Sequence, residues 1–281
     1  MSQVWKIYLC IITSRRVMFR RLLQHELQQS AKSMSLWTAC IAAFIALCIF
    51  MFPSMKGEMD QVGEMFASMG GFSAAFGLDR LNFGSLIGFY ATECGNILGL
   101  GAALFAALVG VNSLSKEEND HTAEFLLTLP VSRSSVIWSK LLSMIMQITV
   151  LNLVCALVSI VSVWAIGESI EWRTLLFLNL SYLLVHIELG CLCFAISSFC
   201  SRTNIGVGMG IAVILYFVNI IANISPDAKP LKYFTPFAYA EGADIIANSN
   251  LDWLLVSIGM VLSVLCITLA FARYSSRDIR S

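Results

Sequence analysis

Six stretches of mostly apolar residues, each about 20 residues long or somewhat longer, alternate with polar segments along the chain. A helix of about 20 apolar residues crosses the roughly 30 Å hydrocarbon core of a bilayer. The pattern therefore predicts an all-α integral membrane protein with six transmembrane helices, forming a single domain over residues 1–281. The predicted spans are residues 34–52, 90–112, 140–166, 175–199, 205–224 and 253–272.

Three of these spans have features that affect their ends. Pro53 follows the first span, and we expect it to end that helix because proline cannot donate to the helical hydrogen-bond ladder. The second span is interrupted near its start by Glu93 and Asn96. The helical pattern of the third begins already at Val136, which gives a helix of about 46 Å. Its first turns should therefore stand in water.

A basic amphipathic segment precedes the first span. From Phe19 to Met34 apolar residues recur every four positions, and arginine, lysine and glutamine occupy much of the remaining circumference. Basic amphipathic helices of this kind lie in the membrane interface. We therefore predict an N-terminal interfacial helix here. Similar spacing predicts short helices in the two long loops, after Pro53 and between Ser225 and Asp252.

The most polar long stretch of the chain, Ser115 to Val136, separates the second and third spans. Ser115 and Glu118 have the spacing of a capping box, which satisfies free amides at a helix start. Acidic residues then share one face and apolar residues the other. Pro130 disfavours helix at the residue before it. The stretch therefore predicts a short helix over residues 115–129, and a serine after Pro130 to cap the third span.

The distribution of charge predicts how the chain crosses the membrane. Residues are 58% hydrophobic and only 13% charged, against about 25% charged in globular domains. With the N-terminus in the cytoplasm, 13 of the 18 basic residues fall inside and 5 outside. Since basic residues favour the cytoplasmic side, we predict cytoplasmic N- and C-termini. The net charge of zero gives no general attraction to nucleic acid.

Polar groups inside the spans are the remaining candidates for function. Ionisable groups at membrane depth are costly and usually face a bundle interior or water. Glu93, His186, Glu188 and Asn219 are therefore candidates for a polar path or an interface between helices, although Glu93 falls close enough to the start of its span to lie at the membrane boundary. His186 and Glu188 are two residues apart and do not share a helix face, so no metal site is predicted from them.

Three stretches resemble a known family. The segment SKEENDHTAEFLLTLPVSRSSVIWSK closely resembles the cytoplasmic segment of ABC-2 type permeases, the membrane-spanning subunits of ATP-binding cassette exporters. Its acidic helix, paired leucines, proline, Ser-Arg and basic residue follow that family's order. LKYFTPFAYAEGADII and RYSSRDIRS resemble the outer segment and the C-terminal end of the same family. A glycine usual in the helix is missing; Asn119 or Asp120 stands in that region.

The resemblance implies that residues 115–129 form a coupling helix that docks on a separate ATPase subunit. It also implies a second permease, a copy or a homologue, and a location in a bacterial plasma membrane. ATP and magnesium would then be bound by the ATPase, and no cofactor by this chain. The expected docking residues are Glu117, Glu118, Asp120, His121, Glu124, Phe125, Leu126 and Leu129.

The residues themselves also argue against an ATPase site in this chain. The phosphate-binding loop needs a Gly-Lys pair, and that dipeptide does not occur. Two alternatives remain: a membrane assembly or immunity factor without transport activity, and an intramembrane metalloprotease, for which the usual His-Glu-x-x-His is missing. For a transporter, the apolar spans favour an amphipathic peptide or drug as the exported substrate. We also expect residues 1–17 to be dispensable, with Met18 as a start.

Overall fold

The computed structural model of the protein describes residues 2–116, 132–200 and 204–276, and every regular element in this part of the chain is a helix. Six helical segments are long and apolar enough to cross a membrane, which confirms the predicted number of spans. Each predicted span overlaps one of them. The six segments are Met18–Glu58, Leu86–Asn112, Arg133–Ile166, Trp172–Ser197, Ile205–Ile224 and Trp253–Ser276.

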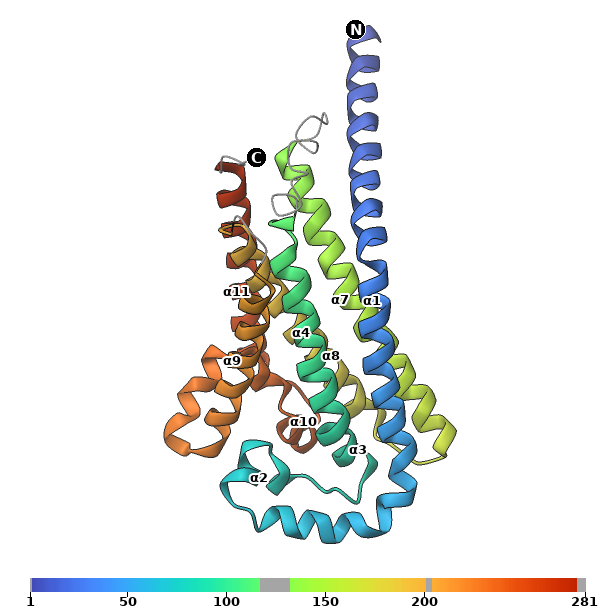
Figure 1. The fold of residues 1–281 in the computed structure, drawn as a ribbon, viewed down its shortest axis with the longest axis vertical. Coiled ribbons are helices and arrows are strands. Elements are labelled where there is room, and N and C mark those ends of the chain that lie inside the picture. The colour runs from blue at the N-terminus through green and yellow to red at the C-terminus, as the bar shows by residue number, and fades with distance from the viewer. Residues whose placement is uncertain (1, 117–131, 201–203, 277–281) are drawn as a thin grey trace.

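The first helix, α1 (Ser2–Ala67), corrects two predictions. It does not end at Pro53 but continues for 14 residues beyond it, and its last part turns away from the bundle axis (Figure 1). An internal proline removes one hydrogen bond and its ring clashes with the carbonyl four residues earlier, so it can kink a helix without ending it. The segment after Pro53 that we expected to be a separate short helix is therefore the end of α1.

The predicted N-terminal interfacial helix is also part of α1. Residues 19–34 are helical as expected, but they continue into the first span without a break, in line with it (Figure 1). Neither glycine nor proline occurs between Phe19 and Phe52, so nothing in the sequence interrupts the helix. Glu26 in this segment forms an ion pair with Lys140 of α7 (Arg133–Ile166), with 3.1 Å between Oε1 and Nζ.

The second span is built from three consecutive pieces. A short helix, α3 (Leu86–Phe89), leads into one π-helical turn at Tyr90–Cys94, and α4 (Gly95–Asn112) completes the span. Single π-turns of this kind occur mostly as bulges in α-helices, often at functional sites. The turn lies where Glu93 interrupts the apolar pattern.

The spans pack in an order that gives them unequal exposure. α4 and α8 (Trp172–Ser197) pack closely on each other, α1 packs on α7, α9 (Ile205–Ile224) on α4, and α11 (Trp253–Ser276) on α8. In the most apolar stretches of the second and fourth spans, 61% and 67% of residues are buried, against 22% in α9 and α11. α4 and α8 therefore form the centre of the bundle, and α9 and α11 leave apolar faces uncovered.

The two long loops fold together at one end of the bundle, and we call this assembly the outer cap because the charge distribution predicts that both loops lie outside. It contains the last part of α1, α2 (Gly71–Ala75) and a 3-10 turn, η1 (Leu78–Arg80), from the first loop. The second loop contributes two 3-10 segments, η3 (Pro226–Phe234) and η4 (Pro236–Ala240), and α10 (Gly242–Asn248), the short helix expected in that loop. Phe237, Tyr239 and Ile245 bury their side chains here, so the cap is continuous with the core.

Candidate functional site

The predicted docking residues lie outside the part of the chain that the structure describes: Glu117, Glu118, Asp120, His121, Glu124, Phe125, Leu126 and Leu129. The structure does describe both flanks of this segment. Ser115 is buried beyond the end of α4 and donates to the carbonyl of Val111. On the other side Ser132 caps α7 by accepting a hydrogen bond from the amide of Ser135, as predicted for this serine cluster.

The end of the bundle that carries these flanks also holds the end of α11 and the N-terminal part of α1, and we call it the inner end because it is predicted to be cytoplasmic (Figure 1). Arg133 at the start of α7 donates from Nη1 to the backbone oxygen of Ser275 at 3.1 Å. Lys140, only 2% exposed, pairs with Glu26 of α1. α7 is therefore tied to both α1 and α11 close to the point where the predicted coupling helix would join it.

His186 is a structural group in the centre of the bundle. It is fully buried on α8, and both ring nitrogens are hydrogen-bonded. Nδ1 lies 3.0 Å from the Asn152 side chain of α7, and Nε2 lies 3.1 Å from the carbonyl of Gly99 on α4. The ring thus ties three spans together and has no free nitrogen for a ligand.

Glu188 points in another direction, as expected from its spacing to His186. Its Oε2 accepts a hydrogen bond from the Tyr239 hydroxyl of η4 at 3.0 Å, and its side chain faces Gly259 of α11. Burial raises the pKa of Tyr239 well above its usual value, and the adjacent carboxylate raises it further, so the hydroxyl stays a donor. Glu188 therefore links the middle of the bundle to the outer cap.

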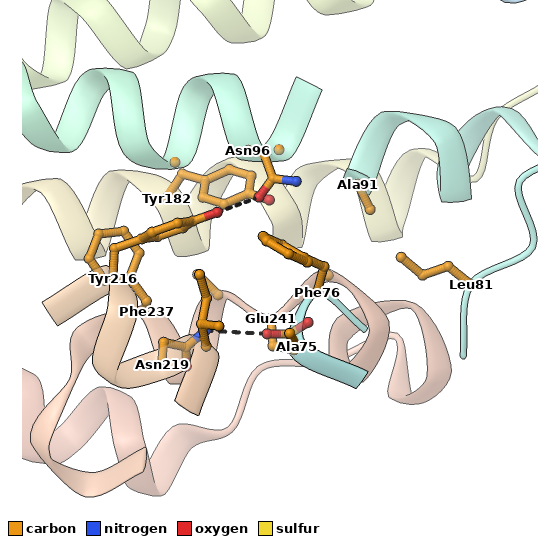
Figure 2. A pocket seen from close by; sticks show the side chains of 15 residues that line it. Ala75, Phe76, Leu81, Ala91, Asn96, Tyr182, Tyr216, Asn219, Phe237 and Glu241 are labelled. Atoms are coloured by element: carbon orange, nitrogen blue, oxygen red, sulfur yellow. Dashed lines mark hydrogen bonds between the residues drawn. The ribbon is translucent and has the colours of Figure 1, made fainter. Parts of the chain in front are cut away.

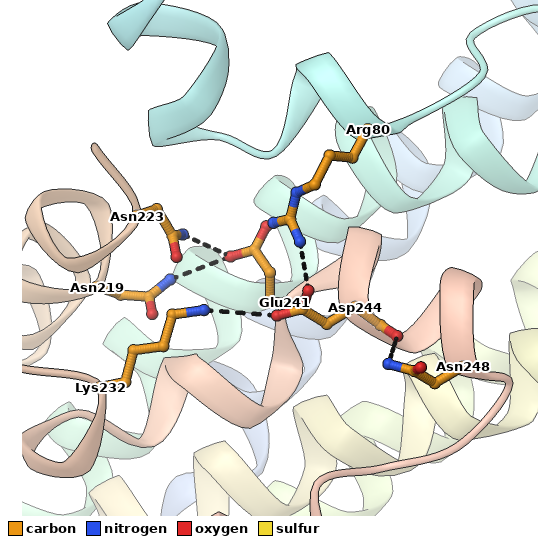
Figure 3. Close-up of polar contacts among 7 residues, drawn as sticks. All are labelled: Arg80, Asn219, Asn223, Lys232, Glu241, Asp244 and Asn248. Atoms are coloured by element: carbon orange, nitrogen blue, oxygen red, sulfur yellow. Dashed lines mark hydrogen bonds and ion pairs between the residues drawn. The ribbon is translucent and has the colours of Figure 1, made fainter. Parts of the chain in front are cut away.

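Asn219 and Asn223 of α9 converge on an acid that the sequence analysis did not single out, Glu241 (Figure 3). Their amide groups donate to its Oε2 at 3.4 and 2.8 Å. The side-chain oxygen of Asn219 is buried and has no hydrogen-bond partner among the described residues. Burial is the largest cause of a raised Glu241 pKa, and the hydrogen bond from Asn223 opposes it.

A second set of charges surrounds this buried acid. Arg80 of η1 and Lys232 of η3 both pair with Asp244 of α10, the latter at 3.5 Å (Figure 3). Gly77, with φ +66°, lets the first loop approach Glu241: a Cβ there would lie 2.6 Å from the Glu241 carboxylate. Both long loops and α9 are thus held together by one polar network.

Glu93 stands apart from these groups. It is exposed on the π-helical turn, which agrees with the interpretation that it lies near the boundary of the second span. None of the hydrogen bonds among the described residues joins any two of Glu93, His186, Glu188 and Asn219. The four predicted polar groups therefore each have their own local surroundings.

Cavities of different size and polarity lie between the described helices. A small one of 60 Å³ is lined by Asn96, Tyr182, Tyr216, Asn219 and Glu241, with the Tyr216 hydroxyl donating to Asn96 at 2.9 Å (Figure 2). A second, of 170 Å³, lies at the inner end beside Glu26 and Lys140. The largest of these, 270 Å³, is mostly apolar and has Glu188 and Tyr239 in its wall.

This geometry bears on the metalloprotease alternative. Such a site needs acid and histidine ligands around one point, but His186 and Glu188 bond to different partners. In the part of the chain that the structure describes, no three His, Cys, Asp or Glu side chains are placed to hold a metal ion. The buried polar groups instead tie helices and loops to one another.

Glu241, Tyr239 and Asp244 are the residues that the sequence analysis missed. All three lie in FAYAEGAD, a run that is largely apolar although it lies between two spans and follows three prolines. An apolar loop is a signal for burial against the bundle, and an acid within it is then a signal for a buried carboxylate.

Comparison with known proteins gives the family to which the chain belongs. A search of curated proteins gave no match. The family model described as "ABC-2 family transporter protein" matches residues 20–279, which includes all six spans and the outer cap. Agreement over this length, with the six spans and the loop order that the resemblance implied, shows that the chain belongs to the ABC-2 transporter family and is a multi-pass membrane permease of that family.

Proposed function

We propose that this permease exports a substrate across the cell membrane, using ATP hydrolysed by a separate ATPase subunit that docks on residues 115–129. In this proposal the inner end of the bundle faces the cytoplasm and the outer cap faces outward. The 13-to-5 division of basic residues supports that orientation. A second permease, a copy or a homologue, would cover apolar faces that the single chain leaves open.

The observation that carries the proposal is the way the two flanks of the docking segment enter the bundle. One flank continues from α4, which packs on α8 at the centre. The other opens α7, which is tied to α11 through Arg133 and Ser275 and to α1 through Lys140 and Glu26. A displacement of residues 117–131 would therefore act on four spans at once.

The length of α7 also supports the proposal that an ATPase acts on the spans through this helix. With 34 residues the helix is about 51 Å long, well beyond a hydrocarbon core of about 30 Å. Its first turns can extend from the membrane and carry a rigid connection between a docked ATPase and the spans. At the other end of the bundle, the polar network around Glu241 holds the outer cap on the spans. A substrate that moves outward must therefore pass or open this cap.

The test is a double substitution in the predicted docking helix, Phe125→Ala with Leu126→Ala. If each side chain is buried on the ATPase, each contributes roughly 1.5–3 kcal/mol, so the pair should weaken docking by roughly a hundredfold or more. Glu117→Gln should act more weakly, because an exposed ion pair contributes about 0–1 kcal/mol. The measurements are co-purification with the proposed ATPase subunit and ATP turnover of the complex.

A matched control is Leu153→Ala with Leu157→Ala, two exposed side chains on the membrane face of α7. This variant removes a similar apolar area without touching the docking segment, and it should form the complex with normal turnover. The proposal fails if the docking double variant keeps full complex yield and full ATP turnover.

A further inference from the structure

The 270 Å³ cavity has a mostly apolar wall that contains one acidic side chain. Its 270 Å³ lie between α8, α9, α11 and the outer cap, and Leu189, Leu215 and Ile258 contribute to its lining. Glu188 is the acid among the lining residues, and Lys232, Tyr233, Thr235 and Tyr239 are the other residues with polar side-chain groups. Apolar residues make up most of the wall, so this cavity is more apolar than the cavities beside Asn96 and beside Lys140.

The Glu188 side chain is held in place, but no basic group in the described ranges pairs with it. The side chain is 7% exposed and accepts one hydrogen bond, from Tyr239 at 3.0 Å. Lys232 also lines the cavity, but its ammonium pairs with Asp244 at 3.5 Å.

Gly259 of α11 gives the Glu188 carboxylate the space that it occupies. A Cβ at this position would lie 2.1 Å from Glu188 Oε2 and 2.8 Å from the carboxyl carbon. Any other residue at position 259 would therefore push the acid out of its place. Because Glu188 and Gly259 both line the cavity, the acid lies against α11 in the cavity wall.

From this geometry we propose that the cavity binds hydrophobic cations: a small quaternary or protonated amine, or the cationic end of a larger amphipathic molecule. An acid at membrane depth is costly unless a partner compensates it, and a cation in the cavity would do so. The apolar lining matches hydrocarbon substituents around the charge. The volume is slightly below the 300–1,000 Å³ typical of sites for drug-sized ligands, which favours a small cation.

This inference rests on the proposed function, because it names the class of substrate that the permease carries. The probe is benzyltrimethylammonium, compared with neopentylbenzene, which has the same shape with carbon in place of the charged nitrogen. Binding is measured by saturation-transfer NMR on the assembled transporter in lipid nanodiscs. The wild-type protein should bind the cation roughly tenfold or more tightly than its neutral counterpart, because the neutral compound has no charge to interact with Glu188.

Two variants test the site from different sides. Glu188→Gln keeps the shape and removes the charge, and it should weaken cation binding roughly tenfold or more without changing binding of the neutral compound. Gly259→Ala should weaken binding of the cation, because the new methyl group displaces the Glu188 carboxylate from its position in the cavity wall. Glu93→Gln is the matched control: it removes another acid in a span, which is exposed and does not line the cavity.

Elution volume and melting temperature identify variants that retain the fold, and only these are compared. Equal cation binding by folded Glu188→Gln and the wild type would overturn the inference. So would equal binding of the cation and its neutral counterpart by the wild type. ATP turnover that depends on Phe125 and Leu126 is measured on the same preparations. If ATP turnover depends on Phe125 and Leu126 but the cation does not bind as expected, the inference is wrong and the proposed function stands. If the cation binds as expected but ATP turnover does not depend on Phe125 and Leu126, the proposed function is rejected.

Discussion

At the scale of single residues, Glu241 has the most unusual surroundings of the acids in the outer cap. It receives amide hydrogen bonds from Asn219 and Asn223, while Asp244, Arg80 and Lys232 act on it by charge. Burial disfavours the carboxylate form and is the main reason that its pKa is raised. The folded protein therefore holds a proton on Glu241 more strongly than the unfolded chain does.

This shift predicts how stability depends on pH. Because the pKa of Glu241 is raised on folding, its contribution to stability is fully present below its ordinary value of 4.5 and is lost as pH rises through the folded value. Glu241→Gln cannot titrate, so its melting temperature should gain on that of the wild type as pH rises above about 4.5. Thermal unfolding in detergent at several pH values measures this difference.

Asp227→Asn is the control, since Asp227 is exposed on η3 of the same cap. Its melting temperature should follow that of the wild type over the whole pH range. A difference between Glu241→Gln and the wild type that does not change with pH would contradict the prediction.

At the scale of elements, glycines set the distance between the two central spans. A Cβ on Gly110 of α4 would lie 2.6 Å from the carbonyl of Gly190 and 2.8 Å from Cys193 Cβ, both on α8. The first is a backbone atom and the second is bonded directly to the backbone, so neither can move aside like the end of a flexible side chain. Small residues of this kind let transmembrane helices approach closely, and packing then holds them together.

We therefore predict that Gly110→Ala destabilises the protein by about 1–3 kcal/mol, as overpacking of a close contact does. Gly210→Ala on α9 is the matched control, because a Cβ there meets nothing within 4 Å. The free energy of unfolding of both variants is measured in the same detergent. Equal stability of the two variants would mean that α4 and α8 separate at little cost.

Helix α1 shows, at the same scale, that the local sequence does not determine whether a proline ends a helix or kinks it. Proline both kinks and ends helices, and the sequence around Pro53 does not decide between these outcomes. Contacts decide it: Phe52 is fully buried, and Lys56, one turn later, pairs with Glu168 at 2.8 Å. These contacts hold residues on both sides of the proline.

At the scale of the whole molecule, the fold places the end of α11 and the outer cap at opposite ends of the bundle (Figure 1). Together with the distribution of basic residues, this predicts that Ser276 is cytoplasmic and Asp227 external. A membrane-impermeant maleimide should therefore label Asp227→Cys in intact cells, and Ser276→Cys only after permeabilisation. The wild-type protein, with its native cysteines, is the background control. Labelling of Ser276→Cys in intact cells would refute the orientation.

The sequence alone determined the number of spans, their approximate bounds and the fold class. These properties are local: about 20 consecutive apolar residues must form a helix in a bilayer, whatever lies beside them. For the same reason the cap at Ser132 and the short helix α10 were predictable from a few neighbouring residues. The order of polar motifs between the spans was also enough to indicate the family.

Only the tertiary structure decided which polar groups meet. His186 bonds to Gly99 across 87 positions, Glu188 to Tyr239 across 51, and Asn219 to Glu241 across 22. A periodicity rule gives the face of a helix on which a side chain lies but not the element that packs on that face. The sequence therefore marked His186, Glu188 and Asn219 as unusual. Helix packing made the first a structural link, placed the second in the wall of a cavity, and gave the third a buried acid as its partner.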